Sequence, residues 1–92
     1  MSPIELNKKN WVLKGNITFN EILFLMNKTK NHNWNENITL DLSQVKNIDT
    51  SLLGLLFEWK RQAKENKYLF NINKAPKNLT KLAQLYGVKE FL

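Results

Sequence analysis

The alternation of apolar and polar positions in the middle of the chain predicts a strand followed by a helix. Every second residue from Ile38 to Leu42 is apolar, as in a strand that buries one face. From Leu52 to about residue 63 the apolar positions recur every three or four residues, which is the period of an amphipathic helix. A short polar turn joins the two elements. We therefore expect the rest of the domain to be arranged around this unit.

Before this unit, the pattern predicts a hairpin and a first helix. The apolar segments Ile4–Leu6 and Trp11–Leu13 flank the turn-forming residues Asn7–Asn10, which favours two antiparallel strands. Over Thr18 to about Lys28, a Thr followed three residues later by a Glu is typical of a capping box at a helix start. The positions expected on the inner side of this helix are Ile22, Leu23, Leu25 and Met26.

The Asn-rich segment Thr29–Asn37 has no periodicity and predicts a loop. Within it, we expect Trp34 to fold back and cover the edge of the core. His32 is the only histidine, and a single histidine in such a loop is usually a surface residue rather than a catalyst or a ligand.

After the central helix, the pattern predicts a strand over Tyr68–Asn73 and a last helix over Leu79–Tyr86. Asn78 can cap this helix and Gly87 can end it in a left-handed conformation. The positions expected to face the core are Tyr68, Phe70 and Ile72 in the strand, Leu79, Leu82, Ala83 and Tyr86 in the helix, and Val88, Phe91 and Leu92 at the C-terminal end.

The predicted order is strand, strand, helix, strand, helix, strand, helix, in one domain over residues 1–92. Two strands joined by a helix are expected to be parallel, with a right-handed crossover. Because both strands alternate, each buries mainly one face. The sequence therefore predicts an α/β fold: a small mixed, partly parallel β-sheet of about four strands, with helices mainly on one face.

The positive charge of the chain does not by itself indicate a nucleic-acid site. The formal net charge is +6, but only Arg61 among the 14 basic residues is an arginine, and the lysines are scattered. A solvated Lys- and Asn-rich surface is the favoured interpretation, and weak attraction to an acidic partner or a membrane surface stays open. We expect no nucleic-acid partner and only an indirect association with a membrane.

Nothing in the sequence is typical of an enzyme. There is no cysteine, no Gly-rich phosphate loop and no metal-ligand spacing, so we expect no catalytic residue, cofactor or metal. No apolar run reaches the length of a membrane span, and the N-terminus lacks the layout of a secretory signal. We therefore expect a cytoplasmic protein.

The central helix has a clear core side, made up of Leu52, Leu55, Leu56, Trp59 and Ala63 at helical spacing. Leu53 and Phe57 fall on its outward side, beside Gly54, Glu58 and Arg61. One interpretation is that Leu53 and Phe57 pack under a neighbouring helix or the C-terminal tail. The favoured one is an apolar docking surface rimmed by charge, where Gly54 permits a close approach.

At the start of this helix, Asp49 is expected to be the N-cap. Thr50 and Ser51 would then lie in the first turn, where small hydroxyl residues are ordinary. A functional role is the alternative: one of the two hydroxyls contacts a partner or is phosphorylated. A phosphate there would be stabilised by the helix dipole and would add charge beside the docking surface.

The segment LDLSQVKNIDTSLLGLL resembles the central signature of STAS domains (sulfate transporter and anti-sigma factor antagonist). The final LTKLAQLYGVKEFL resembles the end of the MlaB-like members, the small subunits of Mla-type phospholipid-transport ABC complexes. The likeness covers roughly the last 55 residues well and the first third only in pattern. One departure is Leu52, where many STAS proteins have a glycine; the glycine here is Gly54.

The resemblance implies a non-catalytic cytoplasmic subunit, peripheral to the inner membrane, that binds and regulates or stabilises the ATPase of an Mla-type transporter and so supports outer-membrane lipid asymmetry. It implies that partners bind around the central helix, with Thr50 at the position associated with partner contact. The alternative is a partner-switching regulator of the anti-sigma factor antagonist type, with a kinase and an anti-sigma-like protein as partners. In that branch, Ser51 occupies the phosphorylated position.

Overall fold

The strand-helix-strand unit predicted for the second half of the chain is present in the computed structural model, which describes residues 2–92. Strand β3 spans Ile38–Ile48, helix α2 spans Thr50–Glu65 and strand β4 spans Phe70–Asn73. The two strands pair in parallel, with Ile38 opposite Phe70. β3 is longer than expected, because it continues through the polar residues after Leu42 and pairs with the preceding strand as far as Ile48.

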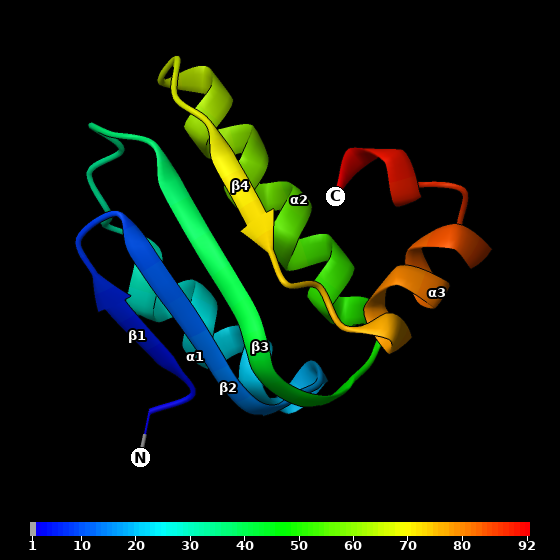
Figure 1. The fold of residues 1–92 in the computed structure, drawn as a ribbon. Helices are drawn as coiled ribbons and strands as arrows, with labels where there is room; N and C mark the ends of the chain where they lie inside the picture. The colour runs from blue at the N-terminus through cyan, green and yellow to red at the C-terminus, as the bar shows by residue number, and fades with distance from the viewer. Residues whose placement is uncertain (1) are drawn as a thin grey trace.

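The N-terminal hairpin completes the sheet. Strands β1 (Ile4–Asn7) and β2 (Asn10–Ile17) are antiparallel and are joined through Lys8, which has a left-handed φ of 54°. The strand order is β1-β2-β3-β4, and β2 is parallel to β3, so the sheet is mixed (Figure 1).

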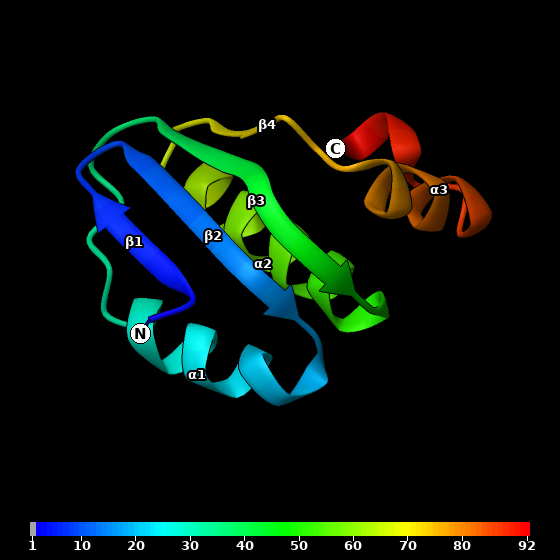
Figure 2. The ribbon, with the colours of Figure 1, turned by 60° about the horizontal axis from the view of Figure 1, so that its bottom comes forward.

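The two main helices lie on the same side of this sheet. Helix α1 (Phe19–Thr29) and helix α2 pack side by side beneath the strands, as Figure 2 shows. Helix α3 (Lys77–Leu85) and the short 3₁₀ helix η1 (Lys89–Phe91) lie at the end of the sheet near α2 (Figure 1). The predicted fold class is therefore confirmed: a small mixed four-stranded sheet with helices mainly on one face.

The core lies between the sheet and the two main helices. The predicted inner stripe of α2 is confirmed, and the alternate residues of β3 meet it from the sheet. The fully buried members are Ile38, Leu40, Leu42, Leu52, Leu56 and Ala63. The opposite face of the sheet is polar and carries, for example, an ion pair between Lys14 and Glu5.

The first helix starts as predicted but presents a narrower buried side. The Glu21 carboxylate accepts hydrogen bonds from the backbone N–H (2.8 Å) and the hydroxyl (2.9 Å) of Thr18. Ile22 and Leu25 are buried, whereas Leu23 and Met26 are 65% and 45% exposed. The prediction was wrong for these two because α1 contacts the sheet and α2 along one flank only.

The C-terminal region also differs from its predicted pattern. Leu79 and Ala83 are buried, but Tyr86 and Phe91 are more than half exposed, so neither faces the core. Helix α3 begins after Pro76 rather than Asn78. The Asn78 side chain instead donates to the carbonyl oxygen of Lys46, where it links α3 to the end of β3.

The strand β4 is shorter than predicted and begins at Phe70. Phe70 is buried and Ile72 is partly buried against the core, as expected. Tyr68 is 36% exposed and precedes the strand, because its backbone N–H closes the C-terminal turn of α2 by donating to Ala63.

An aromatic cluster fills the end of the core that lies away from the start of α2. The Trp11 ring centroid lies 5.4 Å from that of Trp59 and 5.5 Å from that of Trp34. Trp34 is 7% exposed, so its predicted return onto the core is confirmed. The Trp59 indole N–H donates to the buried hydroxyl of Thr29 at 3.0 Å, and the Trp34 indole N–H donates to the side chain of Gln62 at 2.9 Å, so both indole donors have a partner.

His32 belongs to this cluster and is not a simple surface residue. Its ring stands edge-on to Trp11 (5.0 Å between centroids) and to Trp34 (4.8 Å). Its Nε2 atom is buried without a hydrogen-bond partner. Burial lowers the pKa of His32 below its ordinary value of 6.5, because the protonated ring loses hydration there.

This burial predicts a pH dependence of stability. The unfolded chain takes up a proton on His32 at a higher pH than the folded chain does. The free energy of unfolding should therefore be constant above the ordinary pKa and fall as the pH drops below it. Urea denaturation at about pH 7.5 and about pH 5.5 measures the difference, since carboxylates titrate lower. The slope should vanish in His32→Gln; an equal slope in both proteins would contradict the prediction.

Candidate functional site

The start of α2 is organised by the carboxylate of Asp49. As the sequence predicts, Asp49 is the N-cap of α2: its Oδ1 atom accepts hydrogen bonds from the backbone N–H of Ser51, at 3.0 Å, and from the Ser51 hydroxyl. Its Oδ2 atom accepts a hydrogen bond from the backbone N–H of Phe19, at 2.9 Å. Phe19 is the first residue of α1. One carboxylate therefore connects the first turns of both main helices.

These hydrogen bonds keep Asp49 ionised. The Ser51 hydroxyl and the Phe19 N–H lower the pKa of Asp49 below its ordinary value, since both donate to the charged form. The backbone N–H groups of Ser51 and Phe19 are thereby satisfied within the chain. Asp49 therefore acts as a structural anion rather than as a proton donor.

The two hydroxyls beside Asp49 differ in their availability. Ser51 is half-buried, and its Oγ atom already donates to Asp49. Thr50 is exposed, and the donors to Asp49 among the described residues are Ser51 and Phe19 rather than Thr50. Of the two candidates from the sequence, Thr50 is the one that an approaching molecule meets first.

Thr50 lies at the rim of an open hollow of about 350 Å³ between α2 and the C-terminal segment. The hollow is lined by Thr50, Leu53, Gly54 and Phe57 of α2 and by Tyr86 and Val88 after α3. Four residues predicted from the sequence thus meet at one place. Tyr86 and Val88 were missed, because their apolar character favoured core positions. No local pattern shows where a C-terminal segment comes to lie.

Leu53 does not point outward as predicted. It is 6% exposed and belongs to the core cluster, and it forms part of the floor of the hollow. Phe57 is half-buried and packs partly against the same core. The covering of Leu53 comes from α3 and the residues after it, which pack beside α2. The alternative interpretation, packing under the C-terminal tail, therefore holds for Leu53.

Gly54 is exposed and sits at the edge of the hollow. A Cβ atom built on Gly54 would meet no atom of this chain within 4 Å. At an exposed position inside a helix, a glycine makes the helix less stable than an alanine does, by about 1 kcal/mol. The fold of this chain therefore gains nothing visible from the absence of a side chain here.

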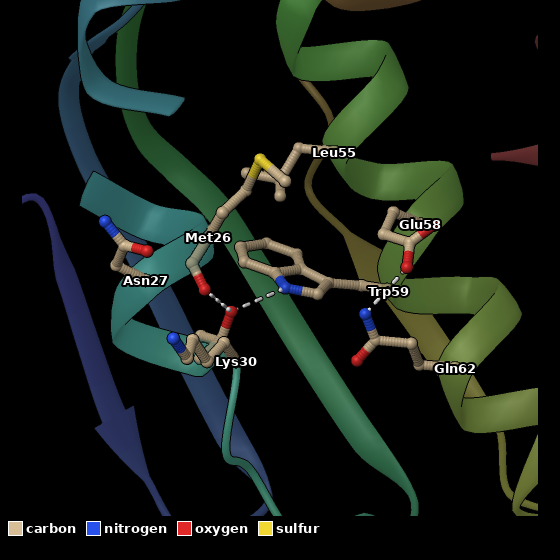
Figure 3. A pocket seen from close by; sticks show the side chains of 8 residues that line it. Met26, Asn27, Lys30, Leu55, Glu58, Trp59 and Gln62 are labelled. Atoms are coloured by element: carbon tan, nitrogen blue, oxygen red, sulfur yellow. Dashed lines mark hydrogen bonds between the residues drawn. The ribbon is translucent and has the colours of Figure 1, made fainter. Parts of the chain in front are cut away.

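Glu58 and Arg61 lie apart from the hollow. Glu58 borders a groove of about 230 Å³ between α1 and α2, on the opposite flank of α2 (Figure 3). Arg61 is exposed and binds both Glu58 and Glu65 through its guanidinium group. These pairs lower the pKa of Glu58 and raise that of Arg61. Three charges of α2, those of Glu58, Arg61 and Glu65, are therefore paired within the helix.

Asp41 and Asp49 are separated by seven residues of β3 and do not form a pair of carboxylates. Asp41 lies on the open face of the sheet and accepts a hydrogen bond from the backbone N–H of Ser43 at 2.7 Å. In residues 2–92, no group of three His, Cys, Asp or Glu side chains is arranged to hold a metal ion. None of the helices in this range is both long and apolar enough to cross a bilayer.

The structure contains a parallel strand pair and a crossover helix that begins at the residues Asp-Thr-Ser. This arrangement is that of the STAS domains, the family that the sequence resembles. The family model described as "Mlab, STAS domain" matches residues 7–92. The chain therefore belongs to this STAS family, over nearly its whole length. This membership supports a regulatory or accessory role.

One solved structure, "Crystal Structure Analysis of Mglu", has a similar fold, with a TM-score of 0.62 and 17% sequence identity. The alignment covers 78% of this chain and 19% of that chain, so this chain spans a small part of that protein. At this identity the likeness supports the fold alone. No curated protein sequence matches the chain.

The double role of Asp49 predicts the effect of removing its carboxylate. Asp49→Ala should lower the free energy of unfolding by about 1–2 kcal/mol, since two helix starts lose an acceptor. Asp41→Ala is the matched control, because Asp41 accepts a single backbone N–H within β3 and caps no helix. Urea denaturation compares the two variants. A loss no larger in Asp49→Ala than in Asp41→Ala would contradict the proposed link between α1 and α2.

Proposed function

We propose that this chain is a non-catalytic STAS subunit that binds the ATPase of an Mla-type ABC phospholipid transporter and regulates or stabilises it. In this role it resides in the cytoplasm, is peripheral to the inner membrane within the complex, and serves outer-membrane lipid asymmetry. Membership of the family described as "Mlab, STAS domain" supports the proposal.

The observation that carries the proposal is the hollow beside the start of α2. Its lining is mainly apolar, and its rim holds the hydroxyl of Thr50 and the bare backbone at Gly54. Apolar floors with a few polar groups at the edge are typical of protein–protein contacts. A large apolar side chain of the ATPase can enter this hollow while the backbone of the ATPase approaches Gly54.

The charges near the hollow support recognition by shape rather than by ion pairs. Arg61 is already bound to two carboxylates of its own helix and is exposed to solvent. Exposed pairs of this kind contribute little when a partner binds. Glu58 and Arg61 are therefore peripheral in the proposed contact, while Thr50, Gly54 and Phe57 are central.

The first test separates binding from stability at Gly54. Gly54→Leu should leave the free energy of unfolding unchanged or higher, because a good helix former replaces glycine at an open position. Its side chain would lie over the mouth of the hollow, so affinity for the purified ATPase subunit should fall at least about tenfold, or 1.4 kcal/mol. Isothermal titration calorimetry measures this affinity. Unchanged affinity would exclude a close approach at Gly54.

The second test changes the wall of the hollow. Phe57→Asp should abolish capture of the ATPase in a pull-down, because it places a charge where an apolar side chain would be buried. Leu69→Asp is the matched control, since Leu69 is 62% exposed and precedes β4, away from the hollow. Circular dichroism checks that both variants are folded. Equal capture by wild type and Phe57→Asp would refute this docking site.

The alternative is a partner-switching regulator of the anti-sigma factor antagonist type, phosphorylated at Ser51. Phosphorylation there would require the Ser51 hydroxyl to leave Asp49 and would bring a dianion beside that carboxylate. Because this geometry opposes the modification, docking is the favoured function. Mass spectrometry after incubation with a cognate kinase distinguishes the two: stoichiometric phosphate at Ser51 that abolishes partner binding would favour the alternative.

A further inference from the structure

Helix α1 exposes four large apolar side chains, an unusual number for a helix of 11 residues. Phe19 is 68% exposed, Leu23 65%, Phe24 46% and Met26 45%. Neither the core nor the hollow uses them. An apolar surface of this kind commonly marks a contact with another molecule.

Three of the four residues form one narrow stripe. Phe19, Leu23 and Met26 are spaced by four and three residues, which places them within about 60° of one another around the helix. Phe24 lies about 100° from Leu23, on the other flank. A stripe with this spacing fits the seam between two helices, whereas a helix lying on a membrane needs a wider apolar face.

The stripe borders the groove between α1 and α2. Met26 reaches from α1 toward Leu55 of α2, above the Trp59 ring (Figure 3). This groove is on the flank of α2 opposite the hollow. A helix laid along α1 would therefore leave the hollow free.

The charges of α1 indicate which helix fits. The ionised carboxylate of Asp49 lies at its start, where it accepts a hydrogen bond from the backbone N–H of Phe19, a residue of the stripe. Lys30 follows its end, about 20° from Phe19 around the axis, and forms no ion pair with the described residues. Glu21 and Lys28 lie on the side of α1 away from the stripe. A helix of the same charge pattern in the antiparallel direction brings opposite charges together and aligns the two dipoles favourably.

We infer that the stripe of Phe19, Leu23 and Met26 pairs with the same stripe of a second copy of this chain, with the two α1 helices antiparallel about a twofold axis near Leu23. Phe19 of one copy then packs against Met26 of the other, as a self-complementary twofold interface requires. The stripe is small compared with the roughly 800 Å² per partner of a stable interface, so the dimer depends on concentration. The dimer presents two free hollows.

Cysteine cross-linking tests the axis, and the chain has no native cysteine to interfere. Leu23→Cys should form an intermolecular disulfide under mild oxidation, because a twofold axis near this position brings the two Cβ atoms to about 4 Å. Phe24→Cys is the matched control on the same helix, off the stripe. Non-reducing electrophoresis should show cross-linking at least tenfold faster for Leu23→Cys. Equal rates would overturn the inference.

Sedimentation equilibrium tests the association itself. Wild type and Phe24→Glu should form dimers as concentration rises, whereas Leu23→Glu should remain monomeric; Leu23 is exposed, so the variant folds. A wild type that stays monomeric up to about 1 mM would overturn the inference. The inference would also be overturned if the wild type bound anionic vesicles, formed no dimer, and lost this binding in Leu23→Glu. Binding of the ATPase is measured separately, because it concerns the hollow and not this stripe.

Discussion

The carboxylate of Asp49 is the point on which the helical layer depends. It accepts a hydrogen bond from the backbone N–H of Ser51 in the first turn of α2 and another from that of Phe19 in the first turn of α1. Both helices therefore begin at the same place beneath the sheet. Backbone N–H groups at helix starts have no partner within their own helix, and an ionised side chain is a strong acceptor for them. The position of Thr50 at the surface follows, because Thr50 comes directly after this anchored residue.

Helix α2 separates two surfaces of different character. On one flank, the C-terminal segment covers Leu53 and leaves an apolar hollow beside Gly54. On the other flank, α1 leaves a groove with polar edges, which Glu58 borders. The two surfaces share no lining residue, so a molecule that occupied one of them would leave the other open.

The chain gives up some stability at both surfaces. Gly54 weakens an exposed helix without any packing benefit in this chain, and the exposed Phe19 and Leu23 keep apolar area in water. The aromatic cluster around Trp11 lies at the other end of the core, where every ring except His32 is buried or nearly so. The largest side chains of the core are thus concentrated away from the hollow beside Gly54.

The sequence by itself determined the elements, the fold class and the cap at Asp49, because periodicity and capping depend on residues a few positions apart. It also identified Thr50, Gly54 and Phe57 as one surface, since a helix brings them to one side. Only the tertiary structure decided that Leu53 is covered, that Tyr86 and Val88 complete the hollow, and that Leu23 and Met26 remain in solvent. A helical period shows which residues share a side, but which side is buried depends on the neighbours that the folded chain brings against it.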